Sequence, residues 1–294
     1  MTLRQAITTA AAELAASPHL SEHAHRDAEL LLLHIAKISR VTLIAHPDSI
    51  LTPSQQALYQ STIARRLQLE PIQYITGEQE FYGLLLHVTP AVLIPRPETE
   101  HLVEAVLHLL PTDRPLKLVD VGTGSGAIAI ALAVHLPLAE ITAIDLSHEA
   151  LAVAERNARL YHLEDRIRFL HSDLLAAINP DETFDAILSN PPYIPESDRS
   201  SLHPQVREHE PTAALFAGET GLDIYRRLIP EAGKALKSNG LLALEIGHGQ
   251  QLSLTNLLTG WNEISFINDL QQIPRVALAR KPDTFDRRGP NLSQ

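Results

Sequence analysis

From Pro115 onward, short apolar segments alternate with segments of helical spacing, and this alternation constrains the fold more than any other feature of the sequence. Apolar residues recur at three- and four-residue steps in "AIAIALAVHL" and "SHEALAVAERNARLY". The expected strands are residues 117–121, 140–145, 167–171, 184–189 and 240–246. Strands that alternate with helices pair in parallel, and helices cover both faces of the sheet. The sequence therefore predicts an α/β fold with a mostly parallel sheet and an antiparallel C-terminal edge pair, "NEISFIND" and "RVALARK".

The N-terminal part of the chain has a different character, because residues 3–70 have the apolar spacing of a small helical bundle. Thr52, Pro53 and Gln55 form a helix start with a capping threonine and a proline at the first helical position. Aromatic and β-branched residues in "QYITGEQEFYGLLLHVTP" then favour a β-hairpin. We expect a helical domain at 1–71, a hairpin linker at 72–95 and a catalytic domain at 96–294, with a frayed end in "DTFDRRGPNLSQ".

Composition limits the classes of function. The 294 residues carry a net charge of −11 and contain no cysteine, which excludes disulfides and thiolate metal sites and is compatible with a reducing compartment. Proteins that grip a phosphate backbone usually carry a basic surface, so this charge counts against DNA or naked RNA as the main substrate. No apolar run approaches the roughly 18 residues of a membrane span. We expect a cytoplasmic protein that binds neither a membrane nor a metal ion.

A glycine-rich turn follows the first strand of the predicted sheet. "VDVGTGSGAIAI" places Gly122, Gly124 and Gly126 between that strand and its helix, where backbone N–H groups and the helix dipole favour an anionic group. Asp145 ends the second strand, where a carboxylate suits the two hydroxyls of a ribose. A tight turn and a helix-capping aspartate would also account for each feature alone, but together they predict binding of a nucleotide-type cofactor.

The spacing G-x-G-x-G differs from the G-x-G-x-x-G of dinucleotide sites. Asp120 adds an acid at the strand end, and an acid there would repel a pyrophosphate. The same acid would suit the ammonium group of S-adenosylmethionine, directly or through water. The sequence therefore favours S-adenosylmethionine over a dinucleotide.

The fourth predicted strand ends in "SNPPYIP", residues 189–195. Two consecutive prolines donate no backbone hydrogen bond and fix the turn. The Asn190 side-chain oxygen and the Pro191 carbonyl can together accept both protons of one planar –NH₂ group, and Tyr193 can cover its flat face. Such a site would hold an amide or amino nitrogen and aim it at an electrophilic methyl group.

These residues carry a resemblance to a known family. The segment Asn190, Pro191, Pro192 and Tyr193 resembles the signature of methyltransferases that act on amide or exocyclic amino nitrogens. "PIQYITGEQEFYG" and "VLIPRPETEHLVE" further resemble the bacterial peptide chain release factor glutamine methyltransferase family (HemK/PrmC). The resemblance extends from "DAEL" to "LALEIGHGQ", which is most of the chain.

The resemblance implies a Rossmann-like class I methyltransferase domain after a helical domain and a hairpin. It also implies transfer of a methyl group from S-adenosylmethionine to the side-chain nitrogen of the glutamine in the Gly-Gly-Gln motif of release factors. The implied cofactor-binding residues are Gly122, Thr123, Gly124, Ser125, Gly126, Asp145, Asp173, Leu174 and Asn190. The implied substrate-binding residues are Asn190, Pro191, Pro192 and Tyr193, of which Asn190, Pro191 and Tyr193 are catalytic. Many relatives have an aromatic residue where Leu174 stands.

Several points stay open at this level. The resemblance places Arg96 and Glu98 in the wall of the site, and the sequence does not define their role. Thr99 and Glu100 could equally be ordinary residues of the first helical turn. An amino methyltransferase acting on DNA adenine or RNA is an alternative, as is a cofactor-binding protein without catalysis. We expect a monomer whose partners are release factors, with helices at the N-terminus that contact the protein substrate.

Overall fold

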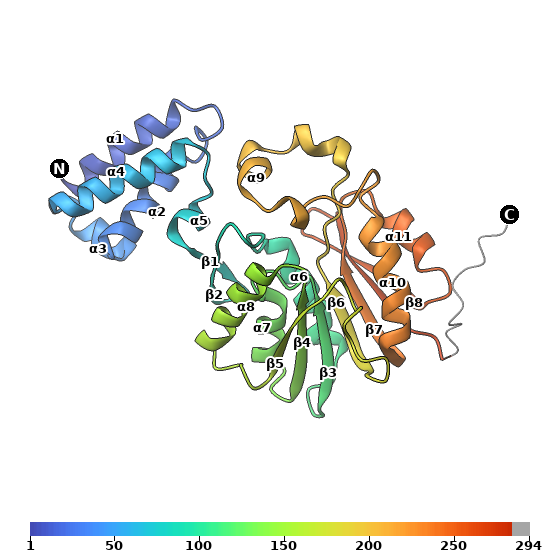
Figure 1. The fold of residues 1–294 in the computed structure, drawn as a ribbon. Coiled ribbons are helices and arrows are strands. Elements are labelled where there is room, and N and C mark those ends of the chain that lie inside the picture. The colour runs from blue at the N-terminus through green and yellow to red at the C-terminus, as the bar shows by residue number, and fades with distance from the viewer. Residues whose placement is uncertain (284–294) are drawn as a thin grey trace. The chain divides into compact units, whose positions relative to one another are not determined.

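A computed structural model describes residues 1–283 of the chain, so most of the segment that is expected to fray lies outside the described residues. The chain divides into two compact units (Figure 1). The first contains residues 1–78 and 203–209, and the second contains residues 79–202 and the chain from residue 210. Each unit is described separately below, and the division into domains at 1–71, 72–95 and 96–294 stays a prediction.

The first unit is helical, as its apolar spacing predicts. Its helices are α1 (Leu3–Ala15), α2 (Ala24–Ala36), α3 (Arg40–Ala45), α4 (Pro53–Leu67), α5 (Ile72–Thr76) and α9 (Pro204–His209). The expected helix start is present, because Thr52 and Gln55 form a capping box at the beginning of α4. Leu14, Leu31 and Ile63 belong to the core that α1, α2 and α4 share.

The segment from residue 72 begins differently from the expected hairpin. Residues 72–76 form helix α5, which ends at Gly77 in the left-handed conformation. The hairpin is limited to β1 (Glu78–Phe81) and β2 (Leu84–His87). The aromatic and β-branched residues therefore predicted the hairpin correctly, but they also led us to miss the short helix before it.

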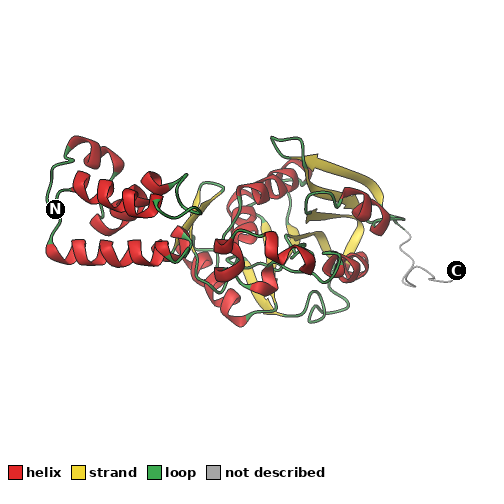
Figure 2. Ribbon diagram, turned by 90° about the horizontal axis from the view of Figure 1, so that it is seen from above, coloured by secondary structure: helices red, strands yellow, loops and turns green. Residues whose placement is uncertain are grey.

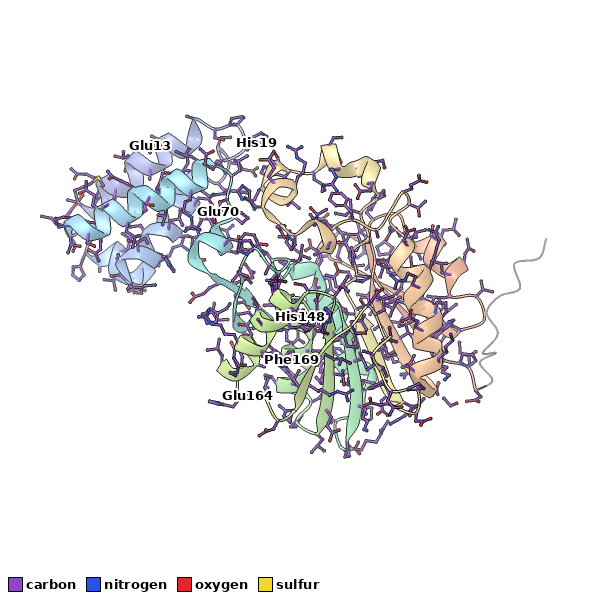
Figure 3. All side chains as sticks on the ribbon, in the orientation of Figure 1. Glu13, His19, Glu70, His148, Glu164 and Phe169 are labelled. Carbon is purple, nitrogen blue, oxygen red and sulfur yellow. The ribbon has the colours of Figure 1, made fainter. Side chains whose placement is uncertain are left out.

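An ion pair is buried inside the first unit. Arg66 donates from Nε to Asp27 Oδ2 at 2.8 Å, and both side chains are almost fully buried. The same guanidinium donates to the backbone oxygen of Glu70 at 3.0 Å and to Oε1 of Gln205 at 2.7 Å. Since Gln205 lies in α9, these bonds hold that late segment of the chain within the helical unit. Figure 3 labels Glu70 on this unit.

The second unit is built on a seven-stranded sheet with the order β5-β4-β3-β6-β7-β9-β8. Its strands are β3 (Leu116–Val121), β4 (Ala139–Asp145), β5 (Ile167–His171), β6 (Phe184–Ser189), β7 (Leu236–Glu245), β8 (Asn262–Asn268) and β9 (Pro274–Arg280). The first five of these pair in parallel, and β9 pairs antiparallel with both β7 and β8. The predicted parallel sheet with an antiparallel edge pair is confirmed.

Helices lie on both faces of this sheet (Figure 2). One core contains residues of α6 (Pro97–Leu109), α7 (Ala127–His135) and α8 (His148–Leu160), and the other contains residues of α10 (Asp223–Ala235) and α11 (Gln251–Leu257). Successive residues of a strand point to opposite faces, so Leu118 enters the first core and Val119 the second. None of the helices within residues 1–283 is both long and apolar enough to cross a membrane.

The parallel order has a direct consequence for the site. β4, β3 and β6 are consecutive in the sheet, so their carboxyl ends lie along one edge. The glycine turn follows β3, Asp145 ends β4 and Asn190 follows β6. The fold thus brings together three segments that are far apart in the sequence, at the edge where open α/β sheets bind ligands.

Candidate active site

A cavity opens at the carboxyl ends of β3, β4 and β6, entirely within the second unit. Its lining includes most of the predicted site residues: Gly122, Thr123, Gly124, Ser125, Asp145, Asp173, Leu174, Asn190, Pro191 and Pro192. Gly126 and Tyr193 are not among the residues that line it. The structure therefore places the predicted cofactor and substrate segments around one cavity, with two residues behind its wall.

The glycine turn is fixed to the neighbouring strand. The backbone N–H groups of Gly122 and Thr123 both donate to the carbonyl of Ile144, each at 2.8 Å. Gly122 and Gly124 have φ angles of 74° and 55°, in the left-handed region that glycine adopts without a Cβ penalty. The turn therefore needs glycine for its conformation, and its backbone faces the cavity without side chains in between.

Gly126 serves the packing of the turn rather than its lining. It caps the start of α7 with a φ angle of 83°. A Cβ at this position would lie 3.0 Å from Cδ1 of Ile130 and 3.2 Å from Cβ of Ala154. Since Ala154 belongs to α8, the missing side chain allows α7 and α8 to approach closely.

The carboxylate of Asp145 is oriented by the backbone on both sides. Oδ2 accepts the N–H of Gly124 at 2.8 Å, and Oδ1 accepts the N–H of Ser147 at 2.9 Å. A carboxylate oxygen can accept more than one hydrogen bond, so each oxygen keeps capacity for a ligand. Asp145 is half-buried and lines the cavity, and its contact with a ribose diol stays a prediction.

Asp120 lies beneath the turn and not in the cavity lining, so the structure does not place it for the direct ammonium contact considered from the sequence. Its Oδ2 accepts the hydroxyl of Thr123 at 2.6 Å and the N–H of Ala129 at 3.2 Å. Burial is the main reason that the pKa of Asp120 rises to about 7, and Oδ1 has no hydrogen-bond partner among the described residues. Asp120 supports the turn from below.

The far wall of the cavity comes from the ends of β4 and β5. Leu146, Ser147, Asp173 and Leu174 line it. Outside this wall the ring of His148, labelled in Figure 3, stacks on His171 with ring centroids 3.7 Å apart. Nε2 of His171 also lies 2.8 Å from the carbonyl oxygen of Leu146. These contacts hold the loop after β4 in place.

Asp173 and Leu174, which the family resemblance implies bind the adenine edge of the cofactor, have additional constraints. Asp173 forms an ion pair with Arg227, whose Nη2 donates to Oδ2 at 2.6 Å. Leu174 has a φ angle of 49°, which is unusual for a residue with a large side chain. Both residues line the cavity, and the pairing of Asp173 with Arg227 could not be expected from sequence, because the two residues lie 54 positions apart.

The turn after β6 is anchored at its first residues. The hydroxyl of Ser189 donates to the carbonyl of Val121 at 2.6 Å, which joins the ends of β6 and β3. The next residue, Asn190, donates from Nδ2 to Oγ1 of Thr99 at 2.9 Å. This bond uses one of the two N–H donors of the Asn190 amide, and Asn190 lines the cavity. Pro191 is buried beside it.

Tyr193 supports this turn from behind. Its backbone oxygen accepts Nε2 of Gln250 at 2.9 Å, and its hydroxyl donates to Oε1 of Glu245 at 3.3 Å. A Cβ on Gly221 would lie 2.2 Å from the Tyr193 carbonyl oxygen, and one on Gly247 would lie 2.9 Å from the Tyr193 ring. Burial raises the pKa of the Tyr193 hydroxyl, so it stays a proton donor near neutral pH. Its predicted contact with the face of a substrate amide stays a prediction.

The residues of "IPRPETE" now have defined contacts. Arg96 forms an ion pair with Glu210, whose side chain is fully buried and also accepts the N–H of Ile94. Glu100 accepts the N–H of Tyr82 at 2.9 Å and so links α6 to the hairpin. Thr99, whose role the sequence left open between the site and an ordinary first helical turn, lines the cavity and accepts Nδ2 of Asn190.

Sequence reasoning missed several lining residues, including Ala91, Val92 and Leu93 before α6 and Ile224 in α10. Pro211, Ala213 and Ala214 contribute to the lining from the short 3₁₀ turn at Thr212–Ala214. No periodicity or motif marks Pro211, Ala213 and Ala214, and the ion pair of the preceding Glu210 with Arg96 becomes visible only in the structure.

Comparison with known proteins agrees with both units. The PrmC N-terminal domain family matches residues 5–77, and the methyltransferase small domain family matches residues 99–205. A curated release factor glutamine methyltransferase from Koribacter versatilis is 46% identical over 286 residues, which cover 96% of this chain and 99% of that protein. A curated protein of the same name from Coxiella burnetii is 44% identical and covers 87% of this chain and 91% of its own length.

Solved structures agree with the fold. The hMettl16 catalytic domain in complex with MAT2A 3′UTR hairpin 1 matches with a TM-score of 0.56 and 15% sequence identity, covering 86% of this chain and 91% of that chain. This likeness supports the Rossmann-like methyltransferase fold alone. The sequence identity to curated relatives extends over nearly the full length of the chain, and it confirms the predicted enzyme class, a methyltransferase. The chain belongs to the release factor glutamine methyltransferase family.

Proposed function

We propose that this protein transfers a methyl group to the side-chain amide nitrogen (N5) of the glutamine in the Gly-Gly-Gln motif of peptide chain release factors. The observation that carries the proposal is the orientation of Asn190 in the cavity. Its amide nitrogen is engaged by Thr99, so its oxygen is the atom left to accept a hydrogen bond from a substrate. An acceptor at this point is what a planar –NH₂ group requires.

The residues of the cavity fit S-adenosylmethionine as the methyl donor. The oriented carboxylate of Asp145 suits the ribose hydroxyls, and Gly122 and Gly124 line the cavity without side chains that would fill it. Leu174, Leu146 and Ala150 supply apolar surface in the same wall. When bound, this cofactor supplies an electrophilic methyl group.

Asn190 and Pro191 act by holding the substrate nitrogen. The Asn190 oxygen and the Pro191 carbonyl accept its two N–H protons, which fixes the plane of the amide and draws electron density toward nitrogen. An amide nitrogen is a poor nucleophile because its lone pair is delocalised, so orientation is the main contribution the protein can make. The double proline adds no backbone donor that would compete for the same acceptors.

Family membership favours this substrate over the alternatives of DNA adenine or RNA, and so does the net charge of −11. The release factors as partners, the monomeric state and the absence of a nucleic-acid substrate remain predictions. The role of the N-terminal helices in contacting the release factor is part of the same proposal.

The test is incubation of the full-length protein and S-adenosylmethionine with a purified release factor, followed by mass spectrometry of the Gly-Gly-Gln peptide. We expect one added methyl group on the glutamine. A release factor with glutamate in place of that glutamine is the matched control and should stay unmodified. Methyl incorporation into the control, or into nucleic acid instead of the release factor, would contradict the proposal.

A further inference from the structure

The turn at residues 190–193 has little capacity to hold itself in place. Pro191 and Pro192 have no backbone N–H, so two successive residues cannot donate a hydrogen bond to the rest of the chain. The proline rings also fix both φ angles, so a shift of Tyr193 passes along the turn with few torsions to absorb it. The carbonyl of Pro191, one of the two proposed acceptors for the substrate amide, therefore depends on how Tyr193 is held.

The side chain of Gln250 holds Tyr193 together with two other loops of the second unit. Its Oε1 accepts the N–H of Gly247 at 2.9 Å. Its Nε2 donates to the backbone oxygen of Tyr193 at 2.9 Å and to that of Gly221 at 3.3 Å. One amide thus joins the turn after β6, the loop before α10 and the loop after β7.

These bonds define which way the Gln250 amide faces. A backbone N–H needs an acceptor and a carbonyl needs a donor, so the amide oxygen must face Gly247 and the nitrogen must face both carbonyls. The reversed amide would place its oxygen against two carbonyl oxygens. Gln250 precedes α11, but in the described part of the chain its side chain makes no capping bond to that helix. The hydrogen bonds of this amide thus serve distant loops rather than the start of its own helix.

Two glycines leave the space that this arrangement needs. A Cβ on Gly221 would lie 2.2 Å from the Tyr193 carbonyl oxygen and 3.0 Å from Nε2 of Gln250. A Cβ on Gly247 would lie 2.9 Å from the Tyr193 ring and 3.0 Å from Oε1 of Gln250. The φ angle of Gly247 is not positive, so its backbone conformation does not call for glycine. What its missing side chain provides is room for Tyr193 and Gln250.

We propose that Gln250 is a positioning residue that fixes Tyr193, and through it the substrate-holding turn, for methyl transfer. The inference rests on the proposed function, because the role of Gln250 is to keep the Pro191 carbonyl and the Tyr193 ring ready for the glutamine amide. Gln250 is not among the residues that line the cavity, so it acts through Tyr193 and not on the substrate. The three bonds of its side chain lead to the substrate side of the site, away from Asp145 and the glycine turn after β3.

Two variants of Gln250 and one control test this role. Gln250→Met keeps the length of the side chain and removes the amide, and Gln250→Glu replaces the donor with a carboxylate oxygen that faces two carbonyls. Gln251→Met makes the first change at the exposed neighbouring glutamine. In single-turnover methylation with saturating cofactor and release factor, we expect Gln250→Met to lose about tenfold in rate and Gln250→Glu about a hundredfold, because a displacement of about 1 Å can cost that much. Gln251→Met should keep the wild-type rate.

Two further comparisons separate positioning from a general structural effect. A short Gly-Gly-Gln peptide should lose the same factor in rate as the intact release factor, because the defect lies at the amide and not in contacts with the body of the substrate. Calorimetry should give an S-adenosylmethionine affinity for Gln250→Met within about threefold of wild type. Loss of cofactor binding in Gln250→Met would show that Gln250 supports the whole cavity, and it would overturn the inference.

The carbonyl of Tyr193 can also be observed directly. The chain has tyrosine followed by isoleucine at two places, 74–75 and 193–194. Protein labelled with ¹³C at the tyrosine carbonyls and with ¹⁵N in isoleucine therefore gives two signals in an HNCO spectrum, and Tyr193→Phe identifies the second. Because loss of a hydrogen bond lowers the ¹³C chemical shift of a carbonyl, the Tyr193 signal should move upfield in Gln250→Met. The Tyr74 signal, from the first unit, should stay in place.

The outcomes are distinct. A wild-type rate in Gln250→Met, an equal loss in Gln251→Met, a loss confined to the intact factor or an unmoved Tyr193 signal would each overturn the inference while leaving the proposed function standing. A wild-type protein that leaves release factors unmethylated would overturn the proposed function and this inference with it.

Discussion

Replacing Glu245 with glutamine removes a carboxyl group that burial makes costly to ionise. Burial is the largest effect that raises the pKa of Glu245 from its ordinary 4.5 to about 7 in the folded protein. Between these two values the unfolded chain has released the proton while the folded protein retains it. The folded state binds more protons in this window, so wild-type stability falls as pH rises through it.

The size of this effect follows from the two pKa values. One pKa unit corresponds to about 1.4 kcal/mol, so ionisation of Glu245 lowers the free energy of unfolding by about 3 kcal/mol between pH 4 and pH 8. Glu245→Gln lacks this titration. The packing cost of the new amide does not depend on pH, so the stability of Glu245→Gln relative to wild type should rise by about 3 kcal/mol across the window.

Urea unfolding followed by tryptophan fluorescence measures this difference. Trp261 is the chain's single tryptophan, and it is buried in a core cluster of the second unit, the unit that contains Glu245. Asp120 also has a pKa raised to about 7, but it titrates in both proteins and cancels in the comparison. A stability difference that does not change between pH 4 and pH 8 would refute the reasoning about Glu245.

Three other perturbations have defined outcomes. Asp145→Ala should weaken S-adenosylmethionine binding about tenfold or more in calorimetry, because charge-assisted hydrogen bonds are worth roughly 1.5–3 kcal/mol; unchanged affinity would remove Asp145 from the ribose site. Arg96→Met should destabilise the second unit by about 2 kcal/mol in the fluorescence assay, because it leaves the buried carboxylate of Glu210 unpaired; wild-type stability would contradict a contribution from this pair. Val41 and Ile44 in α3 have side chains that are 76% and 74% exposed. The double variant Val41→Glu/Ile44→Glu should methylate an intact release factor more slowly than wild type, but a short Gly-Gly-Gln peptide at the wild-type rate. A double variant that methylates the intact factor as fast as wild type would count against substrate contact by these helices.

Most of the sheet could be predicted from the sequence, helped by the central strands β3, β4 and β6, which are buried on both faces. The segments 167–171 and 184–189 form strands over the ranges expected from their apolar residues alone. Helix α4 was equally accessible, since the capping box at Thr52 is a local signal. In each case the residues that determine the structure are neighbours in the chain.

The segment from Glu196 to Ala214 could not be predicted in the same way. It contains two short 3₁₀ turns and helix α9, with polar residues and prolines but no apolar period. Its place depends on contacts with distant residues, such as the bonds of Glu210 to Arg96 and Ile94. The secondary-structure propensities of residues 196–214 carry no information on such long-range contacts.

The same distinction between local and distant signals applies to the site residues. The glycine turn, Asp145 and the Asn190 segment are each recognisable from a short stretch of sequence, and the parallel sheet brings them together. Thr99 was not recognisable, because its contact with Asn190 joins residues 91 positions apart. Glu245 was hidden for a further reason, since an acid near the end of an apolar strand gives no sign that it is buried and bonded to Tyr193.

Single-turnover methylation of a release factor by wild type, Asn190→Asp and Asn190→Ala, each with saturating cofactor, tests most directly whether Asn190 presents the substrate amide. Asn190→Ala should collapse the rate while cofactor affinity stays within a few-fold of wild type. Asn190→Asp keeps an oxygen near the same place but adds a negative charge that stabilises the charged cofactor before transfer, so its rate should lie between the other two. A wild-type rate in Asn190→Ala would contradict the account and leave "SNPPYIP" as a structural turn.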